Sequence, residues 1–391
     1  MIQRAAEKTL KTLSAGFPVV VVTGPRQSGK STLVKTAFKN KPYVTFDEID
    51  TLESAKADPR GFLSRFPGGA IFDEAQKFPD IFPYVKARVD ESKKKGEFIF
   101  TGSQQFGLMS RITESLAGRA AYVQLLPFSM KELKAVNRLP RSLDELLLNG
   151  LYPPLYDRNI LPQHWFVSYV TTYIERDIRA MLNIKELSTF HRFLRMCAAR
   201  TGQLLNISGL ANDCGISNHT ARSWISVLEA SYIIFLLQPH FANFGKRLVK
   251  TPKLYFHDTG LAAWLLNIQN AQHLSIHPSR GALFENIIVS ELLKQRYNSG
   301  SSSNLYFWRD NLGDELDVLI DNGVNLIPVE IKSGATITAD YFRTLDKWKK
   351  ITGRDTQSYL IYAGRERLTR HNIIITPWRD IGDDKRYILA N

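Results

Sequence analysis

The sequence predicts an α/β fold built on a parallel sheet, and three observations support this prediction. Short apolar runs alternate with helix-like stretches through the first third of the chain, a rhythm typical of a parallel sheet with helices on both faces. A glycine-rich turn with the pattern G-x-x-x-x-G-K-S lies between the first of these runs and a helix-like stretch. A second alternation of helix and strand patterns at residues 282–362 predicts a further α/β unit.

The predicted elements divide the chain into four regions, at residues 1–128, 129–187, 188–270 and 280–391. The first region contains strand-like runs at residues 18–22, 43–46, 70–72, 98–100 and 121–125. The second region has a helical pattern, which Gly150 and the pair Pro153-Pro154 interrupt. The third region adds two strand-like runs after a helical set, and the fourth carries the second α/β unit.

The composition indicates a basic intracellular protein. The chain of 391 residues carries 51 Lys and Arg against 38 Asp and Glu, a formal net charge of +13. A strong positive field favours polyanionic partners, and nucleic acid is the first candidate. The two cysteines, Cys197 and Cys214, lack the spacing of a metal or redox site, which indicates a reducing compartment. Since no run approaches the roughly 18 apolar residues of a membrane span, we expect a cytoplasmic protein without a membrane partner.

The glycine-rich turn predicts a binding site for the phosphates of a nucleotide. Glycines let the backbone approach phosphate oxygens closely, and the amide groups at the start of the following helix point toward negative charge. We expect Lys30 to reach the β- and γ-phosphates and the Ser31 hydroxyl to bind Mg²⁺. The predicted nucleotide-binding residues are Gly24, Pro25, Arg26, Gln27, Ser28, Gly29, Lys30, Ser31 and Thr32.

Two acidic residues after the third apolar run predict the catalytic part of the same site. Asp73 could hold Mg²⁺, and Glu74 could polarise the water that attacks the γ-phosphate. A polar side chain after the next run could orient this water, and Ser103 or Gln104 is a better candidate than Thr101. Acidic residues also end strands without a catalytic role. The prediction therefore depends on their place between the glycine-rich turn and a further buried strand.

Arg119 is the candidate for a charge that acts on a neighbouring subunit. It lies just before the run at residues 121–125, and an arginine at such a place could reach the γ-phosphate bound by a neighbour. Arg111 is the alternative. A surface arginine without function would look the same in the sequence.

Together these motifs resemble those of AAA+ ATPases. Their particular residues are similar to those of a prokaryotic branch of these ATPases that is fused to a C-terminal domain of unknown function. The matching stretches are Gly24-Pro-Arg-Gln-Ser-Gly-Lys-Ser, Asp73-Glu-Ala-Gln, Thr101-Gly-Ser, Leu116-Ala-Gly-Arg119, Gly150-Leu-Tyr-Pro-Pro, Tyr173-Ile-Glu-Arg-Asp177 and Phe284-Glu-Asn. The resemblance implies ATP and Mg²⁺ as cofactors, a helical lid over about residues 129–183, and a homo-oligomer, with a hexameric ring as one form. It assigns no clear role to Arg176.

Residues 207–230 have the pattern of a winged helix. Two helices joined by a glycine-containing turn match helix–turn–helix spacing, and the strand-like runs after them would form a wing. The apolar face would consist of Ala211, Ile216, Ala221, Ile225 and Leu228. DNA contacts would come from His219, Thr220, Arg222 and the wing residues Lys246, Arg247, Lys250 and Lys253. Phosphate contacts of this kind carry no sequence information, so we expect selection of a DNA structure. A helical bundle that contacts protein is the alternative.

Two strand patterns in the last region carry charged residues at a spacing that indicates a nuclease-like site. Strand alternation places Glu330 and Lys332 on one side of their strand, and a hairpin could bring Asp317 beside them. Glu285, on the preceding helix, could complete a site for Mg²⁺ or Mn²⁺ that activates water against a phosphodiester. This pattern resembles the PD-(D/E)xK nuclease fold. Folds of this kind also serve as inactive binding modules.

The leading hypothesis is an ATPase that engages DNA, with branched or forked DNA as a candidate substrate. Its catalytic residues would be Lys30, Glu74, Arg119 and Ser103. Two alternatives stay open. One is a nucleotide-gated, Mg²⁺-dependent DNA endonuclease, and the other is a non-enzymatic switch in which ATP sets an assembly state and the basic surface recruits protein partners.

Overall fold

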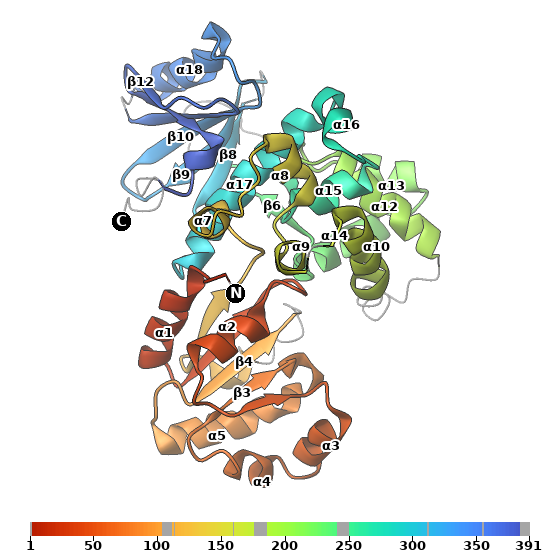
Figure 1. The fold of residues 1–391 in the computed structure, drawn as a ribbon, viewed down its shortest axis with the longest axis vertical. Helices are drawn as coiled ribbons and strands as arrows, with labels where there is room; N and C mark the ends of the chain where they lie inside the picture. Colours follow the sequence, from red (N-terminus) through yellow and green to blue (C-terminus); the bar gives the residue numbers. More distant parts are fainter. Residues whose placement is uncertain are drawn as a thin grey trace. The chain divides into compact units, whose positions relative to one another are not determined.

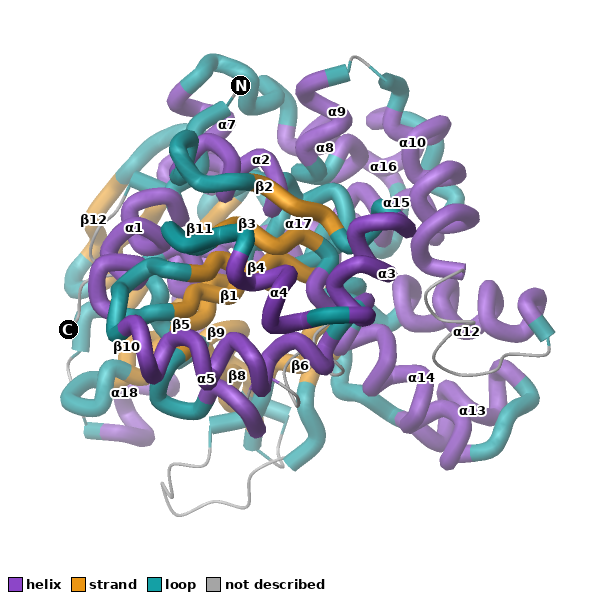
Figure 2. Tube along the Cα trace, turned by 90° about the horizontal axis from the view of Figure 1, so that it is seen from below, coloured by secondary structure: helices purple, strands orange, loops and turns teal. Residues whose placement is uncertain are grey.

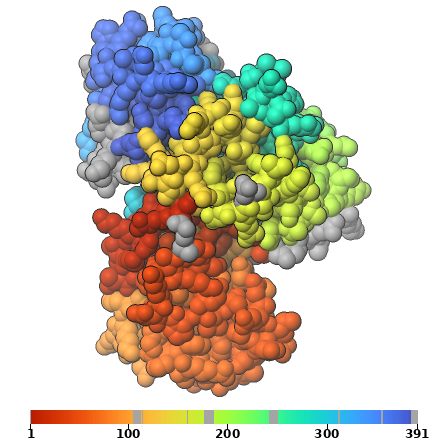
Figure 3. Space-filling model, viewed as in Figure 1, coloured from red at the N-terminus to blue at the C-terminus, as the bar shows by residue number. Residues whose placement is uncertain are grey.

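The computed structural model describes residues 2–103, 112, 114–158, 160–175, 186–240, 250–310, 313–353 and 356–383. Contacts group the chain into two compact units (Figure 1). The first unit consists of Met1–Phe128, Ala230–Tyr232 and Arg296–Ser302, and the second consists of Ser129–Glu229, Ile233–Gln295 and Ser303–Asn391. Figure 3 shows the main part of the first unit in red and orange, with its side chains closely packed.

A parallel sheet forms the centre of the first unit. Its described strands are β1 (Val19–Thr23), β2 (Tyr43–Thr45), β3 (Ala70–Asp73), β4 (Phe98–Gly102) and β5 (Ala120–Gln124), in the order β2-β3-β4-β1-β5. Each strand overlaps one of the apolar runs in the sequence, and each pairing is parallel, which confirms the predicted core. A parallel sheet is buried on both faces, and its strands therefore appear in the sequence as continuous apolar runs.

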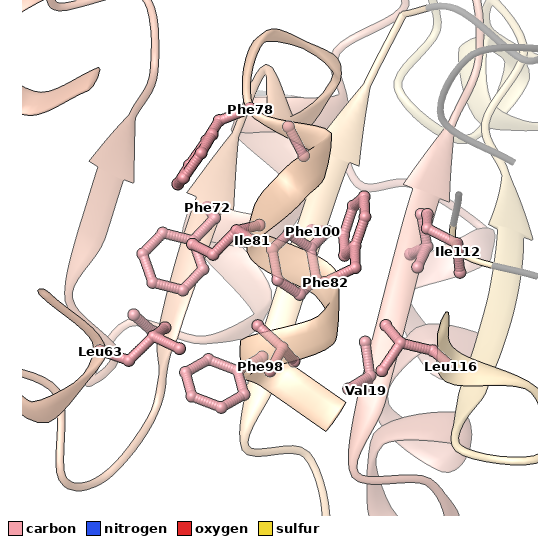
Figure 4. Close-up of a cluster of buried hydrophobic side chains, with 14 of the residues drawn as sticks. Val19, Leu63, Phe72, Phe78, Ile81, Phe82, Phe98, Phe100, Ile112 and Leu116 are labelled. Carbon is pink, nitrogen blue, oxygen red and sulfur yellow. The ribbon is translucent and has the colours of Figure 1, made fainter. Parts of the chain in front are cut away.

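Helices cover both faces of this sheet (Figure 2). They are α1 (Ala6–Gly16), α2 (Lys30–Ala37), α3 (Ile49–Ala57), α4 (Pro59–Ser64) and α5 (Phe82–Ser92), with the 3₁₀ turns η1 (Ala75–Lys77) and η2 (Pro79–Ile81). On one face, α3, α4 and α5 pack over a cluster that includes Phe72, Phe82 and Phe100 (Figure 4). On the other face, α1 and α2 pack over Val20 and Ile99. Successive side chains of a strand point to opposite faces, so each central strand contributes to both clusters.

Two short segments from later in the chain complete the first unit. The Tyr232 hydroxyl donates to Thr23 Oγ1 over 2.8 Å, at the end of β1. The Thr9 hydroxyl donates to the Asn298 carbonyl over 2.7 Å. The helices α14 (Asn218–Ala230) and α17 (Arg280–Asn298) therefore both end within the first unit.

The second unit contains most of the helices and a mixed sheet. Its other described helices are α7 (Met130–Ala135), α8 (Leu143–Asn149), α9 (Pro153–Asp157), α10 (Pro162–Tyr169), α12 (Leu187–Ala199), α13 (Ile207–Cys214), α15 (Thr259–Leu265), α16 (Ala271–Ile276) and α18 (Arg343–Thr352). Shorter turns are the π-helical η3 (Val170–Ile174) and the 3₁₀ turns η4 (Ala339–Phe342) and η5 (Trp378–Asp380). Among the residues that the structure describes, no helix is both long and apolar enough to cross a membrane.

Two groups of strands lie in the second unit. The mixed sheet has the order β12-β13-β11-β10-β9-β8. Its strands are β8 (Leu305–Arg309), β9 (Glu315–Asp321), β10 (Leu326–Lys332), β11 (Ser358–Tyr362), β12 (Leu368–Arg370) and β13 (Ile373–Pro377). The antiparallel pair β6 (Ile234–Leu237) and β7 (Lys253–Phe256) forms the second group. The chain just after β6 joins the two groups, because the His240 amide donates to the Phe307 carbonyl of β8 over 2.8 Å.

The stretch Gly150-Leu-Tyr-Pro-Pro is held by a buried carboxylate of the same unit. Asp258 accepts the amide of Leu151 over 2.7 Å and the amide of Leu261, at the start of α15, over 3.2 Å. Gly150 has a φ of +64°, and a Cβ there would lie 2.1 Å from Asp258 Oδ1. Only glycine fits both constraints, and the stretch therefore has a packing role in this fold.

Candidate functional site

The glycine-rich turn lies between the end of β1 and the start of α2. Gly24 has a φ of +148°, and a Cβ there would lie 2.1 Å from the Leu125 carbonyl oxygen, so the turn requires glycine. The buried Arg4 supports the turn from α1's side, because its guanidinium donates to the Ser28 carbonyl over 2.6 Å and to the Leu126 carbonyl over 2.7 Å. Nothing in the spacing of the sequence pointed to Arg4.

Lys30 is buried inside the turn, and among the described residues its ammonium directly contacts backbone carbonyls and no carboxylate. Its ammonium donates to the Gly24 carbonyl over 2.9 Å and to the Pro25 carbonyl over 2.8 Å. Burial lowers the pKa of Lys30 to about 8, although Glu74 and Asp73 act to raise it. A buried ammonium that directly contacts only carbonyl oxygens favours binding of an anion. A bound phosphate group would raise the pKa of Lys30 back toward its ordinary value.

The carboxylate of Asp73 collects four donors at the end of β3. Ser31 donates its hydroxyl to Oδ2 over 2.7 Å, and Tyr43 of β2 donates its phenol to the same oxygen. Thr101 donates to Oδ1, which also accepts the Glu74 amide over 3.1 Å. The structure thus brings the two predicted Mg²⁺ residues together, and hydroxyl and carboxylate oxygens are the ligands that Mg²⁺ prefers.

Glu74 and Ser103 meet through a third residue, Gln76. The Gln76 amide donates to Glu74 Oε2 and, over 3.3 Å, to the Ser103 hydroxyl. Glu74 adopts the left-handed conformation with a φ of +54°, which is uncommon for a residue with a side chain. This contact holds the predicted water-polarising carboxylate near Ser103, the predicted polar residue that follows β4. Gln104, the other candidate, lies outside the described residues.

Sequence reasoning did not single out Tyr43 and Gln76, and it considered Thr101 only as the end of a strand. Gln76 lies two residues after Glu74, so its closeness to Glu74 could be predicted from the sequence. Tyr43 reaches Asp73 only because β2 pairs with β3. Local sequence does not determine the order of strands in a sheet.

Arg119 lies away from the glycine-rich turn of its own chain. Its carbonyl accepts the Val19 amide over 3.2 Å, at the amino end of β1, whereas the turn follows the carboxyl end. A strand of this length separates the two by about 16 Å. The Arg119 side chain is 34% exposed, and its guanidinium pairs with Asp90 of α5, with Nη2 and Oδ2 2.9 Å apart. A role in this chain's own site is therefore not supported, and action on a neighbour stays a prediction. Arg111 lies outside the described residues.

The four predicted nuclease-like residues lie together in the second unit, where Glu330 is buried and Glu285, Asp317 and Lys332 are partly buried. Lys332 of β10 pairs with Glu330 over 2.5 Å, and Asp317 of β9 accepts the Ile331 amide over 2.7 Å. Asp317 also interacts electrostatically with Glu330 and with Glu285 of α17. The predicted hairpin of β9 and β10 is present, with Val318 paired to Val329.

The structure adds three charged residues to this cluster. Lys253 of β7 pairs with Glu285 over 3.0 Å and with Glu315 of β9. Arg309 of β8 also pairs with Glu315, with Nη1 and Oε2 2.9 Å apart. Tyr255, also on β7, donates its phenol to Glu285. We call this group the carboxylate cluster; it consists of Glu285, Glu315, Asp317 and Glu330 with Lys253, Lys332 and Arg309. No group of three or more described His, Cys, Asp or Glu side chains is arranged to hold one metal ion.

Burial dominates the electrostatics of the carboxylate cluster. It raises the pKa of Asp317 well above the ordinary value, and the neighbouring Glu330 and Glu285 add to this. Burial also raises the pKa of Glu330, against the pull of Lys332. For Lys253, burial acts to lower the pKa, but Glu285, Asp317 and Glu315 outweigh it and raise the pKa above the ordinary value.

The prediction that Lys253 belongs to a DNA-facing wing is wrong. Its side chain is only 2% exposed and is held by carboxylates, so it is not available to a phosphate backbone. Lys250 is exposed, whereas Lys246 and Arg247 lie outside the described residues.

The helix–turn–helix pattern corresponds to α13 and α14. Between them, Gly215 has a φ of +68°, and the Ser217 hydroxyl accepts the Thr220 amide over 3.0 Å. His219 and Arg222 are exposed on the first turns of α14. Of the predicted apolar face, Ala211, Ala221, Ile225 and Leu228 are buried, and Ile216 is partly buried. A role for these residues in DNA contact stays a prediction.

Three known families match successive parts of the chain. Residues 16–134 match a family described as an AAA domain, which confirms the predicted P-loop ATPase core. Residues 140–272 match a domain of unknown function, DUF8612, and residues 280–381 match another, DUF4143. The C-terminal part is thus a domain of unknown function, as the sequence resemblance implied.

Two curated mycobacterial proteins are similar over most of the chain. The uncharacterized proteins Rv2008c of Mycobacterium tuberculosis and Mb2031c of Mycobacterium bovis are each 33% identical to it, over 85% of this chain and 74% of theirs. Among solved structures, the Walker-type ATPase paby2304 of Pyrococcus abyssi is 16% identical. That match covers 68% of this chain and 96% of the archaeal chain, with a TM-score of 0.45.

Proposed function

The chain belongs to the family of its two mycobacterial relatives and contains an AAA-type P-loop ATPase domain, and we propose that it hydrolyses ATP with Mg²⁺ and engages DNA. The observation that carries the ATPase proposal is the meeting of Lys30, Ser31 and Asp73 at the carboxyl edge of the parallel sheet. Glu74 follows Asp73 at the same edge, where Gln76 holds it.

Each residue has a distinct role in the proposed reaction. Ser31 and Asp73 would hold Mg²⁺, which neutralises phosphate charge when bound. Lys30 would leave the Gly24 and Pro25 carbonyls for phosphate oxygens and so place a positive charge where negative charge develops. Glu74 would polarise the attacking water, in the position that Gln76 and Ser103 set.

The proposal is tested by nucleotide binding and phosphate release in three variants. Lys30→Ala should lose tight ATP binding and slow turnover by about 10²-fold or more. Glu74→Gln should bind ATP with Mg²⁺ as the wild type does but turn over about 10²-fold more slowly. Lys39→Ala, at an exposed lysine after α2, is the matched control and should be unchanged. Normal turnover in Lys30→Ala would refute the proposed mechanism.

DNA engagement is supported by charge and by local geometry. The chain has a net charge of +13, and α14 presents His219 and Arg222 to solvent at its first turns. We expect Arg222→Ala to weaken binding of forked and linear DNA alike and to reduce the salt dependence of affinity. Arg343→Ala, an exposed arginine at the start of α18, is the control. A wild-type affinity that does not respond to salt would contradict a phosphate-binding role.

We propose that the chain forms an oligomer in which Arg119 acts on a neighbour's nucleotide. The backbone of Arg119 lies at the amino end of β1, about 16 Å of strand away from the glycine-rich turn of its own chain. Mixing Arg119→Ala with Lys30→Ala tests this, because each variant would supply what the other lacks. Recovery of part of the ATPase activity is expected, and no recovery in a mixture shown to co-assemble would contradict the proposal.

A metal-dependent endonuclease is the second candidate function, favoured by the meeting of Glu285, Asp317 and Glu330 with Lys332. As these side chains lie, the described carboxylates do not surround one metal position. Incubation with Mg²⁺ or Mn²⁺ and plasmid or branched DNA tests this candidate. Absence of cleavage would leave a binding role. The third candidate, an assembly switch, predicts very slow turnover with tight retention of nucleotide.

A further inference from the structure

Arg4 is a buried cation that bridges the glycine-rich turn and the segment that follows β5. Only 8% of Arg4 is exposed, and its guanidinium donates to the Ser28 carbonyl over 2.6 Å and to the Leu126 carbonyl over 2.7 Å. A longer contact reaches the Pro127 carbonyl over 3.4 Å, and Arg4 Cζ lies 4.9 Å from the centre of the Phe128 ring. These residues all belong to the first unit. The planar fork of an arginine donates to separate acceptors in fixed directions, whereas a lysine ammonium has no fixed orientation.

The segment after β5 supports both ends of the glycine-rich turn. At the first end, the Leu125 amide donates to the last carbonyl of β1 over 2.8 Å. The Leu125 carbonyl oxygen also lies so close to Gly24 that a Cβ there would be 2.1 Å away. At the second end, Arg4 joins Ser28 to Leu126, the next residue of the segment. The turn is thus held at both ends by one segment, which is itself hydrogen-bonded to β1.

The contact with Arg4 determines the direction of one amide in the turn. The described part of the chain contains no cis peptide bond, and the C=O and N–H groups of a trans peptide point in opposite directions. Because the Ser28 carbonyl points toward Arg4, the Gly29 amide of the same peptide points away from Arg4. Gly29 directly precedes α2, and the amides at the start of a helix have no helical partner and bind phosphate groups.

We propose that Arg4 is a positioning residue that preforms the phosphate site by fixing the peptide between Ser28 and Gly29. The Gly29 amide then faces a phosphate group of the nucleotide without rearrangement of the turn, and affinity rises because the turn is ordered before binding. Arg4 itself touches no phosphate in this role. The inference rests on the proposed nucleotide-binding function and deepens it. We expect the same effect on ADP and ATP, because Arg4 acts on the turn and not on the γ-phosphate.

The first test measures ADP binding by calorimetry, with and without Mg²⁺. Arg4→Met should bind ADP at least about ten-fold more weakly than the wild type, because the peptide between Ser28 and Gly29 is no longer held. Arg60→Met, at an exposed arginine of α4, is the matched control and should bind as the wild type does. A wild-type protein that binds no nucleotide would contradict the proposed function. Equal ADP affinity in the wild type and in a folded Arg4→Met protein would overturn this inference alone.

A second test separates positioning from a general loss of stability. Hydrogen exchange followed by mass spectrometry should show several-fold faster exchange of residues 24–32 in nucleotide-free Arg4→Met, with the exchange of β4 unchanged. Val89→Ala shortens a buried side chain of α5 and should lower stability, but it should keep the wild-type affinity for ADP. Unchanged exchange of the turn in Arg4→Met, or an equal loss of ADP affinity in Val89→Ala, would overturn the proposal.

A milder variant keeps the proposal testable if Arg4→Met does not fold. Arg4→Lys retains the positive charge but not the planar fork, and it should bind ADP at least about three-fold more weakly than the wild type. Its turnover at saturating ATP should stay within about two-fold of the wild type, because the lost interaction contributes to binding and not to the chemical step. Wild-type ADP affinity in a folded Arg4→Lys protein would overturn the proposal.

Discussion

Lys30 in the first unit and Lys253 in the second are both buried, yet their partners differ in kind. Lys30 contacts two backbone carbonyl oxygens, at 2.9 and 2.8 Å, and burial lowers its pKa to about 8. Lys253 contacts two carboxylates, which raise its pKa above the ordinary value despite burial. Among the described residues, the Lys30 ammonium has no carboxylate in direct contact, whereas the Lys253 ammonium contacts two.

This difference separates a binding site from an internal ion pair. Uncompensated buried charge has an energetic cost that a ligand can relieve, so the site of Lys30 favours an incoming phosphate. Lys253 gains nothing from a further anion, because Glu285 and Glu315 already neutralise it. Buried charge alone therefore does not identify a binding site. The sign of the unmatched charge indicates which ligand each site could accept.

The largest expected effect is on the free energy of unfolding at pH 7. Lys253→Met removes the ammonium that the partly buried Glu285 and Glu315 share, while Glu315 keeps its ion pair with Arg309, so stability should fall by about 3 kcal/mol. Lys30→Met removes a buried charge that has only carbonyl partners, so the nucleotide-free protein should lose nothing and gain up to about 2 kcal/mol. Urea unfolding of both variants measures the contrast.

A matched control for this comparison is Lys250→Met, which should change stability by less than about 0.5 kcal/mol because its side chain is exposed. Equal changes in the free energy of unfolding for Lys253→Met and Lys30→Met would contradict the predicted difference between the two lysines.

The first lysine could be found from the sequence, and the second could not. Lys30 stands in a motif whose residues are consecutive, and the strand before it and the helix after it fix where its side chain lies. The parallel sheet was likewise predicted, because each strand is a continuous apolar run with helices between. Local order in the chain was enough in these cases.

Lys253 was misassigned because its neighbours in sequence are not its neighbours in space. It follows Lys250 closely and appeared to extend a basic wing, but β7 places it against α17 and β9. The acids Glu285, Asp317 and Glu330 were predicted to meet because hairpin register joins two of them. No local sequence pattern predicts that Lys253 of β7 is the cation paired with these acids, since that pairing depends on tertiary packing.

A second, smaller effect is the pH dependence of ATP affinity. ATP requires the protonated form of Lys30, whose pKa in the free protein is about 8. As pH rises through 8 the free protein loses this proton, and binding must take it up again, so affinity should fall about ten-fold between pH 7 and pH 9. Calorimetry in buffers of different ionisation enthalpy would measure proton uptake near pH 8.

Lys30→Arg is the control for this effect, because a guanidinium does not titrate in that range. Its affinity for ATP should be weaker but should stay flat between pH 7 and pH 9. A wild-type affinity for ATP that is also constant between pH 7 and pH 9 would mean that Lys30 keeps its proton in the free protein. The pKa of Lys30 would then not be lowered, and the contrast with the raised pKa of Lys253 would fail.

The smallest expected effect concerns the acidic side of the comparison. The pKa of Asp317 is raised in the folded chain by burial and by Glu330 and Glu285, so the folded state keeps a proton that the unfolded chain releases near about pH 4. Stability that this proton contributes at low pH is lost as pH rises above that value. Asp317→Asn should therefore lose less stability with rising pH and should exceed the wild type by about 1 kcal/mol at pH 7.5.

Thermal unfolding of both proteins between pH 5 and pH 8 would measure this difference in slope. The Asn side chain can still accept the Ile331 amide, so the hydrogen bond of 2.7 Å is kept and only the charge is removed. Asp346→Asn, at an exposed position of α18, should leave the pH profile unchanged. Parallel profiles for Asp317→Asn and the wild type would mean that the folded chain does not retain this proton, and the raised pKa of Asp317 would be contradicted.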